Sequence, residues 1–183
     1  RSYNSQDTRE GLFGYCWTFG FEGSLEYSGN EVVIRTPTGG GYTYRVNNDG
    51  TFTAKDSRST LVKTSSGYIM TTADQYTYGF TNGKMTWMKD KNGNQITITY
   101  DNNKITSIKD AFNRTIRMSY GTVNGRTRLT SVTDPINRSV TYTYDSNGLL
   151  TKVTDPNGNE TNYVYRRPAL SGNLKDYRLE EIY

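Results

Sequence analysis

The chain has 183 residues, of which 33% are hydrophobic, and it carries 16 Tyr, 18 Gly, one Cys, no His and a formal net charge of +4. A single Cys without any His excludes an internal disulfide, His-based catalytic triads and Cys/His zinc sites. Lys and Arg form no long block of like charge, which argues against a nucleic-acid-binding surface, and no apolar run is long enough for a membrane-spanning helix.

The same composition argues against disorder, although the mean hydropathy is low at −0.80. Aromatic residues make up 13% of the chain, whereas disordered chains are poor in them. Tyr, Thr, Val and Ile suit half-buried strands, and Gly, Asn and Asp suit the turns between strands. We therefore expect an all-β protein in which successive β-hairpins form a continuous, twisted, open antiparallel sheet.

Residues 1–84 have the strand-and-turn pattern without regular spacing. The first twenty, RSYNSQDTREGLFGYCWTFG, cluster aromatics and Gly around Cys16, and we expect a plug or end cap there, with Cys16 as a small apolar filler. Asn48-Asp49-Gly50 lies between two strand-like segments and predicts a hairpin. Asn82-Gly83 predicts another turn. We take 1–84 as an N-terminal β-rich segment, either a cap or a set of irregular repeats.

Residues 85–183 contain four copies of one pattern, centred on an Asp, followed by the start of a fifth. The anchors are Asp90, Asp110, Asp134 and Asp155. A Gly or Asn stands three residues after each, namely Gly93, Asn113, Asn137 and Gly158. A Tyr stands ten residues after each, namely Tyr100, Tyr120, Tyr144 and Tyr165. A Thr stands four before each, namely Thr86, Thr106, Thr130 and Thr151. Repeats of this length are typical of stacked, quasi-one-dimensional architectures.

Each copy is predicted to be a β-hairpin whose Asp opens the turn. An Asp carboxylate accepts backbone N–H bonds two residues on, Pro135 and Pro156 preset φ, and Gly or Asn tolerates the left-handed conformation. Strict alternation after the turn places three apolar or aromatic residues on one buried face, together with the Thr and the apolar residue two before the anchor. The apolar residue five before the anchor falls out of phase, which either a β-bulge or a covering layer on the other face would explain.

The chain ends within this pattern. Leu179 and Ile182 stand three apart, as does the apolar pair before every anchor, so the next Asp is expected just beyond Tyr183. This predicts a fragment cut within a repeat array.

Four kinds of chemistry are alternatives to a structural role for these residues. Glycoside hydrolysis needs one facing pair of carboxylates, and four equivalent Asp residues fit turn geometry better; Glu22, Glu26 and Glu31 are the remaining clustered candidates. The Asp90 and Asp155 turns resemble calcium loops, but the other two copies carry Arg at a ligand position. The acceptor pattern for N-glycosylation arises from the turn itself. Trp17, Trp87 and several Tyr could stack on sugar rings.

The pattern Leu-Thr-x-Val-Thr-Asp-Pro ending in Tyr-x-Tyr-Asp at 129–145 resembles the RHS/YD-repeat family, and looser copies begin at 85, 105 and 150. The opening YNSQDTREGLFGYCWTF resembles the segment that precedes the array in such proteins, although many members carry Gly where Cys16 stands. The resemblance implies a bacterial secreted or cell-surface protein whose sheet spirals into a hollow shell around a variable C-terminal, often toxic, region.

The expected function is thus a non-catalytic scaffold, with no catalytic, metal or cofactor site and no cofactor. Its partners would be the rest of its own array and an enclosed C-terminal cargo domain. The alternative is a surface adhesin module that binds cell-wall or host glycans. No nucleic-acid partner and no membrane span are expected.

Overall fold

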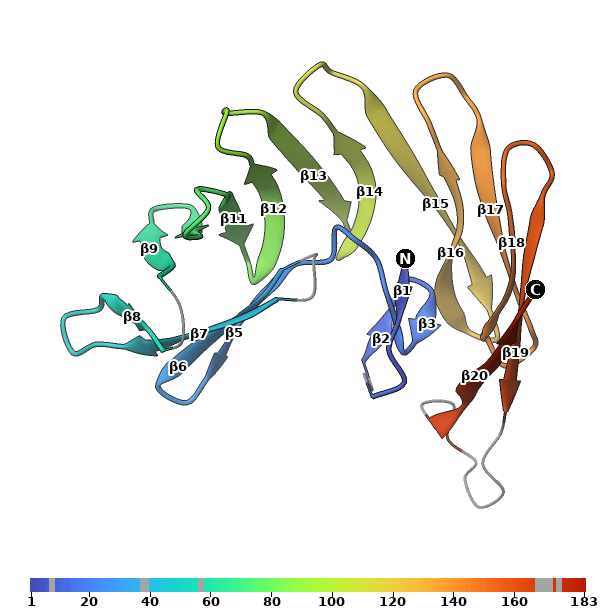
Figure 1. The fold of residues 1–183 in the computed structure, drawn as a ribbon, viewed down its shortest axis with the longest axis horizontal. Helices are drawn as coiled ribbons and strands as arrows, with labels where there is room; N and C mark the ends of the chain where they lie inside the picture. Colours follow the sequence, from blue (N-terminus) through green and yellow to red (C-terminus); the bar gives the residue numbers. More distant parts are fainter. Residues whose placement is uncertain (7–8, 37–39, 56–57, 167–172, 174–175) are drawn as a thin grey trace. The chain divides into compact units, whose positions relative to one another are not determined.

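The structure is a computed structural model that describes residues 1–6, 9–36, 40–55, 58–166, 173 and 176–183. The chain is nearly all β, built from successive antiparallel hairpins in sheets that do not close into a barrel, so the expected fold class is confirmed (Figure 1). Within the described part, no helix is both long and apolar enough to cross a membrane. The chain divides into two compact units, residues 1–19 with 115–183 and residues 20–114.

The unit formed by residues 20–114 contains two groups of hairpins that share strand β12. The first group is a ribbon of β5 (Ser24–Ser28), β6 (Glu31–Arg35), β7 (Gly41–Val46) and β8 (Phe52–Ala54). The second is a sheet of β9 (Thr60–Thr64), β10 (Gly67–Thr71), β11 (Thr77–Thr81), β12 (Lys84–Lys89), β13 (Gln95–Asp101) and β14 (Lys104–Lys109). The start of β12 pairs with β5 at Lys84 and its end pairs with β13, so the ribbon leaves the sheet at this strand.

Apolar side chains from both groups form the core of this unit. Val32, Ile34 and Tyr44 from the ribbon are fully buried, as are Met70 and Met85 from the sheet. The buried Tyr44 hydroxyl is hydrogen-bonded to the Ser59 hydroxyl. The predicted hairpin at Asn48-Asp49-Gly50 is present between β7 and β8, and Asn82-Gly83 joins β11 to β12.

The other unit is a meander of six strands with a small N-terminal segment. The meander comprises β15 (Thr115–Val123), β16 (Arg126–Thr133), β17 (Ser139–Tyr144), β18 (Leu150–Thr154), β19 (Glu160–Arg166) and β20 (Arg178–Ile182). The N-terminal segment has two short pairs, β1 (Ser2–Tyr3) with β4 (Trp17–Thr18), and β2 (Glu10–Gly11) with β3 (Gly14–Tyr15).

A β-bulge recurs where each copy of the repeat begins. In the pair of β13 and β14, Tyr100 lies opposite Ile105 while Thr99 lies opposite Ser107, which leaves Thr106 as the extra residue. The same shift leaves Thr86, Thr130 and Thr151 as the extra residues in the other copies. One extra residue changes the parity of a strand, so the residues five and two before the anchor share a face. This confirms the bulge explanation for the residue that was out of phase.

The bulge assigns the repeated Thr a role that the period-two pattern did not indicate. Each of these Thr side chains is half-buried, and its hydroxyl donates to the opposite carbonyl at 3.1–3.4 Å, for example from Thr130 to Ser119. The most buried positions are instead those five before the anchor, namely Met85, Ile105, Leu129 and Leu150. Strand β20 shows the same register, with Leu179 opposite Tyr165 and Glu180 as the extra residue.

The boundary predicted at residue 84 describes the sequence pattern and stays a prediction. Packing groups the chain differently, because residues 1–19 pack with 115–183, whereas 85–114 pack with 20–84.

Candidate functional site

The four anchor Asp residues build one and the same five-residue turn. In each turn, Oδ1 accepts the backbone N–H groups two and four residues on at 2.8–2.9 Å. Oδ2 accepts a side-chain donor four residues on at 2.6–2.8 Å, which is Asn94, Arg114, Arg138 or Asn159. The residue three on has positive φ in every copy, 87° for Gly93, 64° for Asn113, 65° for Asn137 and 86° for Gly158. These contacts explain why Asp, Gly or Asn, and Asn or Arg recur at this spacing.

Hydrogen bonding keeps these carboxylates ionised. The Asn94 side-chain bond, followed by backbone N–H bonds, holds the pKa of Asp90 below its usual value, and Asn159 does the same for Asp155. At Asp110 and Asp134, partial desolvation acts to raise the pKa, but bonds from Arg114 and Arg138 outweigh it. A carboxylate whose two oxygens are occupied by N–H donors is a poor proton donor and offers few lone pairs to a cation. Within the described residues, no group of three or more His, Cys, Asp or Glu could hold a metal ion.

The same turn occurs at positions that the sequence reasoning missed. Asp145 opens one, with its Oδ1 accepting from Asn147 and Leu149 N–H at 2.9 Å. Thr72 opens another, where its hydroxyl takes the place of the carboxylate and accepts from Tyr76 N–H. The spacing of Asp145 to Gly148 is the anchor-to-Gly spacing already noticed, so this turn could have been found from the sequence. The Thr72 turn lacks the Asp, and only its backbone bonds reveal it.

In two copies, the repeated Tyr closes its own copy. The Tyr100 hydroxyl donates to the Met85 carbonyl at 2.8 Å, and that of Tyr144 donates to the Leu129 carbonyl at 2.6 Å. In both copies, the bond joins the residue ten after the anchor to the residue five before it. Burial raises the pKa of Tyr100 to about 12 and also raises that of Tyr144. The Tyr therefore acts as a protonated donor that ties the two ends of a hairpin together.

In the unit of residues 1–19 and 115–183, the N-terminal segment packs on the aromatic side chains of the repeats. The Phe13 ring lies 4.9 Å from Tyr142, and the Trp17 ring lies 5.1 Å from Tyr163. Trp17 Nε1 donates to the Tyr165 hydroxyl at 2.8 Å, so this Tyr bonds to the segment rather than closing its copy. Cys16 is buried at φ 66°, a conformation that favours Gly, and its burial fits the apolar filler expected there.

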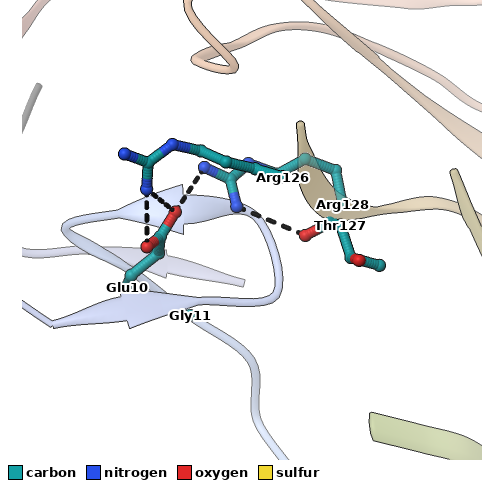
Figure 2. A pocket seen from close by; sticks show the side chains of 5 residues that line it. All are labelled: Glu10, Gly11, Arg126, Thr127 and Arg128. Carbon is teal, nitrogen blue, oxygen red and sulfur yellow. Dashed lines mark hydrogen bonds and ion pairs between the residues drawn. The ribbon is translucent and has the colours of Figure 1, made fainter. Parts of the chain in front are cut away.

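An ionic cluster fixes the same segment to strand β16 (Figure 2). Glu10 Oε1 accepts from Arg128 Nη2 at 2.6 Å, and both Glu10 oxygens accept from Arg126 Nη1 at 2.8 Å. Arg128 is only 3% exposed, and its Nε donates to the Gly148 carbonyl at 3.1 Å. Partial desolvation acts to raise the pKa of Glu10, but the bonds from the two guanidinium groups lower it overall. Together with Gly11 and Thr127, the three side chains line a hollow of about 300 Å³.

Both Trp residues and two of the Glu residues indicated by the sequence are engaged in packing or ion pairs. Trp17 lies in the N-terminal segment and is buried against the repeats, and the Trp87 ring lies against Gly79, where an added Cβ would meet it at 2.0 Å. Glu26 pairs with Arg35 at 3.4 Å, and Glu31 pairs with Lys55. In their place, the structure brings together Tyr27, Phe52 and Tyr68, with Tyr27 54% exposed.

Models of two known protein families match parts of this chain. Residues 123–160 match the RHS repeat, and residues 1–44 match a domain of unknown function, DUF6531. The first match covers the copy anchored on Asp134 and reaches into the next, and the second covers the N-terminal segment and the first ribbon strands. No curated protein matches the chain.

Proposed function

We propose that this chain, which matches the RHS repeat over residues 123–160 and DUF6531 over residues 1–44, forms part of the wall of an RHS/YD-repeat shell that encloses or displays a toxin or effector. In this proposal, the chain has no catalytic role and belongs to a secreted or cell-surface bacterial protein. RHS repeat proteins are typically extracellular or located at the cell surface, which supports this location. Its partners are the rest of its own array and an enclosed C-terminal cargo domain.

The observation that carries this proposal is the repeated hairpin itself. Every copy uses the same Asp turn and the same Thr bulge, and these contacts serve backbone geometry. A bulge at each start bends the strand pair and increases its local twist. A wall around a cargo requires a curved sheet, and a bulge at the same place in every copy is a local device that supplies such bending. Four equivalent turns with occupied carboxylates also match a scaffold better than a single catalytic centre.

The test is limited proteolysis of the natural full-length protein that contains this chain. The region after the array should resist digestion under native conditions and should be cut rapidly when it is expressed alone. Equal rates of digestion in the two settings would contradict enclosure. The isolated chain should show no hydrolase activity on glycans, which tests the non-catalytic part separately.

The second candidate function is glycan binding, and one surface favours it. The ring centroids of Tyr27 and Phe52 lie 6.3 Å and 5.9 Å from that of Tyr68, and the Tyr27 and Tyr68 hydroxyls are hydrogen-bonded at 2.8 Å. Exposed aromatic rings with hydroxyls can stack on sugars and bond to their hydroxyl groups. If the chain binds glycans through this surface, calorimetry with peptidoglycan fragments should detect heat of binding in the unaltered chain and none in the Tyr27→Ala variant. An absence of heat in the unaltered chain would rule it out for these ligands.

A further inference from the structure

Five Asn-Gly dipeptides lie in turns of this chain, at Asn82, Asn92, Asn124, Asn147 and Asn157. An Asn followed by Gly is prone to intramolecular attack by the next backbone nitrogen, because Gly has no side chain to hinder the approach. We propose that Asn124, in the turn between β15 and β16, is the site at which the folded chain undergoes spontaneous deamidation, and that the repeat turns protect three of the others.

The reaction requires only water as a co-reactant. The Gly125 nitrogen attacks Asn124 Cγ, a C–N bond forms, and the bond from Cγ to Nδ2 breaks. The proton of the Gly125 N–H group leaves with Nδ2 as ammonia, and a succinimide ring results. Water then opens the ring at either carbonyl and leaves Asp or isoaspartate at position 124.

The Asp turns occupy the attacking N–H group in three of the five sites. Gly93 N–H donates to the Asp90 carbonyl at 3.1 Å, Gly148 N–H to that of Asp145 at 3.0 Å, and Gly158 N–H to that of Asp155 at 3.0 Å. The N–H of the preceding Asn is held as well, because it donates to the carboxylate of the same Asp. Attack at these sites therefore has to break the turn first.

Packing restrains the fourth site, Asn82-Gly83. The Gly83 carbonyl accepts Leu25 N–H at 2.9 Å, and a Cβ placed on Gly83 would lie 3.0 Å from the Leu25 carbonyl oxygen. The peptide that has to rotate toward the Asn82 side chain is thus held against strand β5.

Asn124-Gly125 has neither restraint. Both residues are exposed, and no atom lies within 4 Å of a Cβ built on Gly125. Among the described residues, no hydrogen bond is made by Gly125 N–H. The attacking nitrogen is free, and the turn has room to rearrange.

Deamidation at this place would act on the ionic cluster two residues away. The flanking residues Val123 and Arg126 are paired, and isoaspartate would add a backbone atom to the two-residue connection between them. The new carboxylate would also compete with Glu10 for Arg126. The modification is therefore expected to loosen the attachment of the N-terminal segment to β16.

The test is incubation of the folded chain at mildly alkaline pH, followed by tryptic digestion and mass spectrometry. Cleavage after Lys and Arg places the five dipeptides in five different peptides, so their rates are measured in one sample. Asn124 should convert at least about five-fold faster than the three protected sites, since a net hydrogen bond has to be broken at each of those. In the denatured chain, the five rates should converge. Equal rates at Asn124 and Asn92 in the folded chain would overturn the proposal.

A variant tests the protection directly. Asp90→Ala removes the carboxylate that holds the Asn92 turn, and Asn92 should then deamidate about five-fold faster while Asn157 keeps its rate. An unchanged rate at Asn92 would contradict shielding by the turn. If all five rates rise together, the variant has unfolded, and Asp155→Ala with Asn157 as the accelerated site provides the same comparison in another copy.

Discussion

Removing the Glu10 carboxylate should destabilise the unit that contains it more than any surface ion pair does. Glu10→Ala leaves the guanidinium of Arg128, which is 3% exposed, without its anionic partner. Breaking a buried pair in this way costs about 3–5 kcal/mol. Because the Glu10 side chain is 31% exposed, water replaces part of the lost interaction, and we expect about 2–3 kcal/mol. For a chain of this size, that lowers Tm by about 4–12 °C.

Calorimetry and urea unfolding measure the loss of stability caused by Glu10→Ala, and two further variants serve as controls. Glu160→Ala removes the partner of Lys152 in an exposed pair and should cost no more than about 1 kcal/mol. Adding Arg128→Met to Glu10→Ala removes the unpaired charge and should recover stability. A cost for Glu10→Ala as small as that of Glu160→Ala, or no recovery in the double variant, would refute the reasoning.

The dependence on pH follows from the lowered pKa of Glu10, in which the bonds from the two Arg side chains outweigh partial desolvation. The stabilisation is complete above the ordinary pKa of 4.5 and is lost as the pH falls through the lower pKa of the folded state. The difference in unfolding free energy between the unaltered chain and Glu10→Ala should therefore shrink in strong acid. A difference that stayed constant from neutral pH to strong acid would contradict an ionic origin.

Three other predictions concern the repeat contacts. Tyr144→Phe should cost about 1–2 kcal/mol in urea unfolding, because it leaves a buried carbonyl without its donor, whereas Tyr142→Phe should cost less, since the described residues offer its hydroxyl no hydrogen bond. Gly79→Ala should cost about 1–3 kcal/mol, because a Cβ would lie 2.0 Å from an indole ring, whereas Gly41→Ala, with open space around it, should be nearly neutral. Ultraviolet titration should place the pKa of Tyr100 near 12, so its contribution to stability is complete below pH 10 and is lost as the pH rises toward 12.

The turns were the part of the fold most accessible from the sequence. An Asp followed three residues later by Gly or Asn specifies both the acceptor and the left-handed residue of the turn, and four copies made the pattern visible. The hairpins at Asn48-Asp49-Gly50 and Asn82-Gly83 followed from the same local chemistry. These features depend on residues close together in the chain, where propensity and hydrogen bonding decide the outcome.

Contacts between distant segments could not be predicted in the same way. The pairing of Glu10 with Arg126 and Arg128 joins residues more than a hundred positions apart, and no local pattern in either segment indicates the other. The packing of Trp17 against Tyr163 and Tyr165 is of the same kind, which is why the sequence left stacking on sugars open as the alternative for these aromatic residues. The role of Thr was missed because an alternating pattern assumes a strand without an extra residue.

For Tyr100 and Tyr144, the tyrosine hydroxyl and the carbonyl that it binds belong to the same copy, as do each anchor Asp and the residues two and four positions on that its carboxylate binds. Recombination that deletes or duplicates a whole copy would carry both halves of these bonds along with it. The number of copies can thus change during evolution without requiring compensating substitutions in the neighbouring copies.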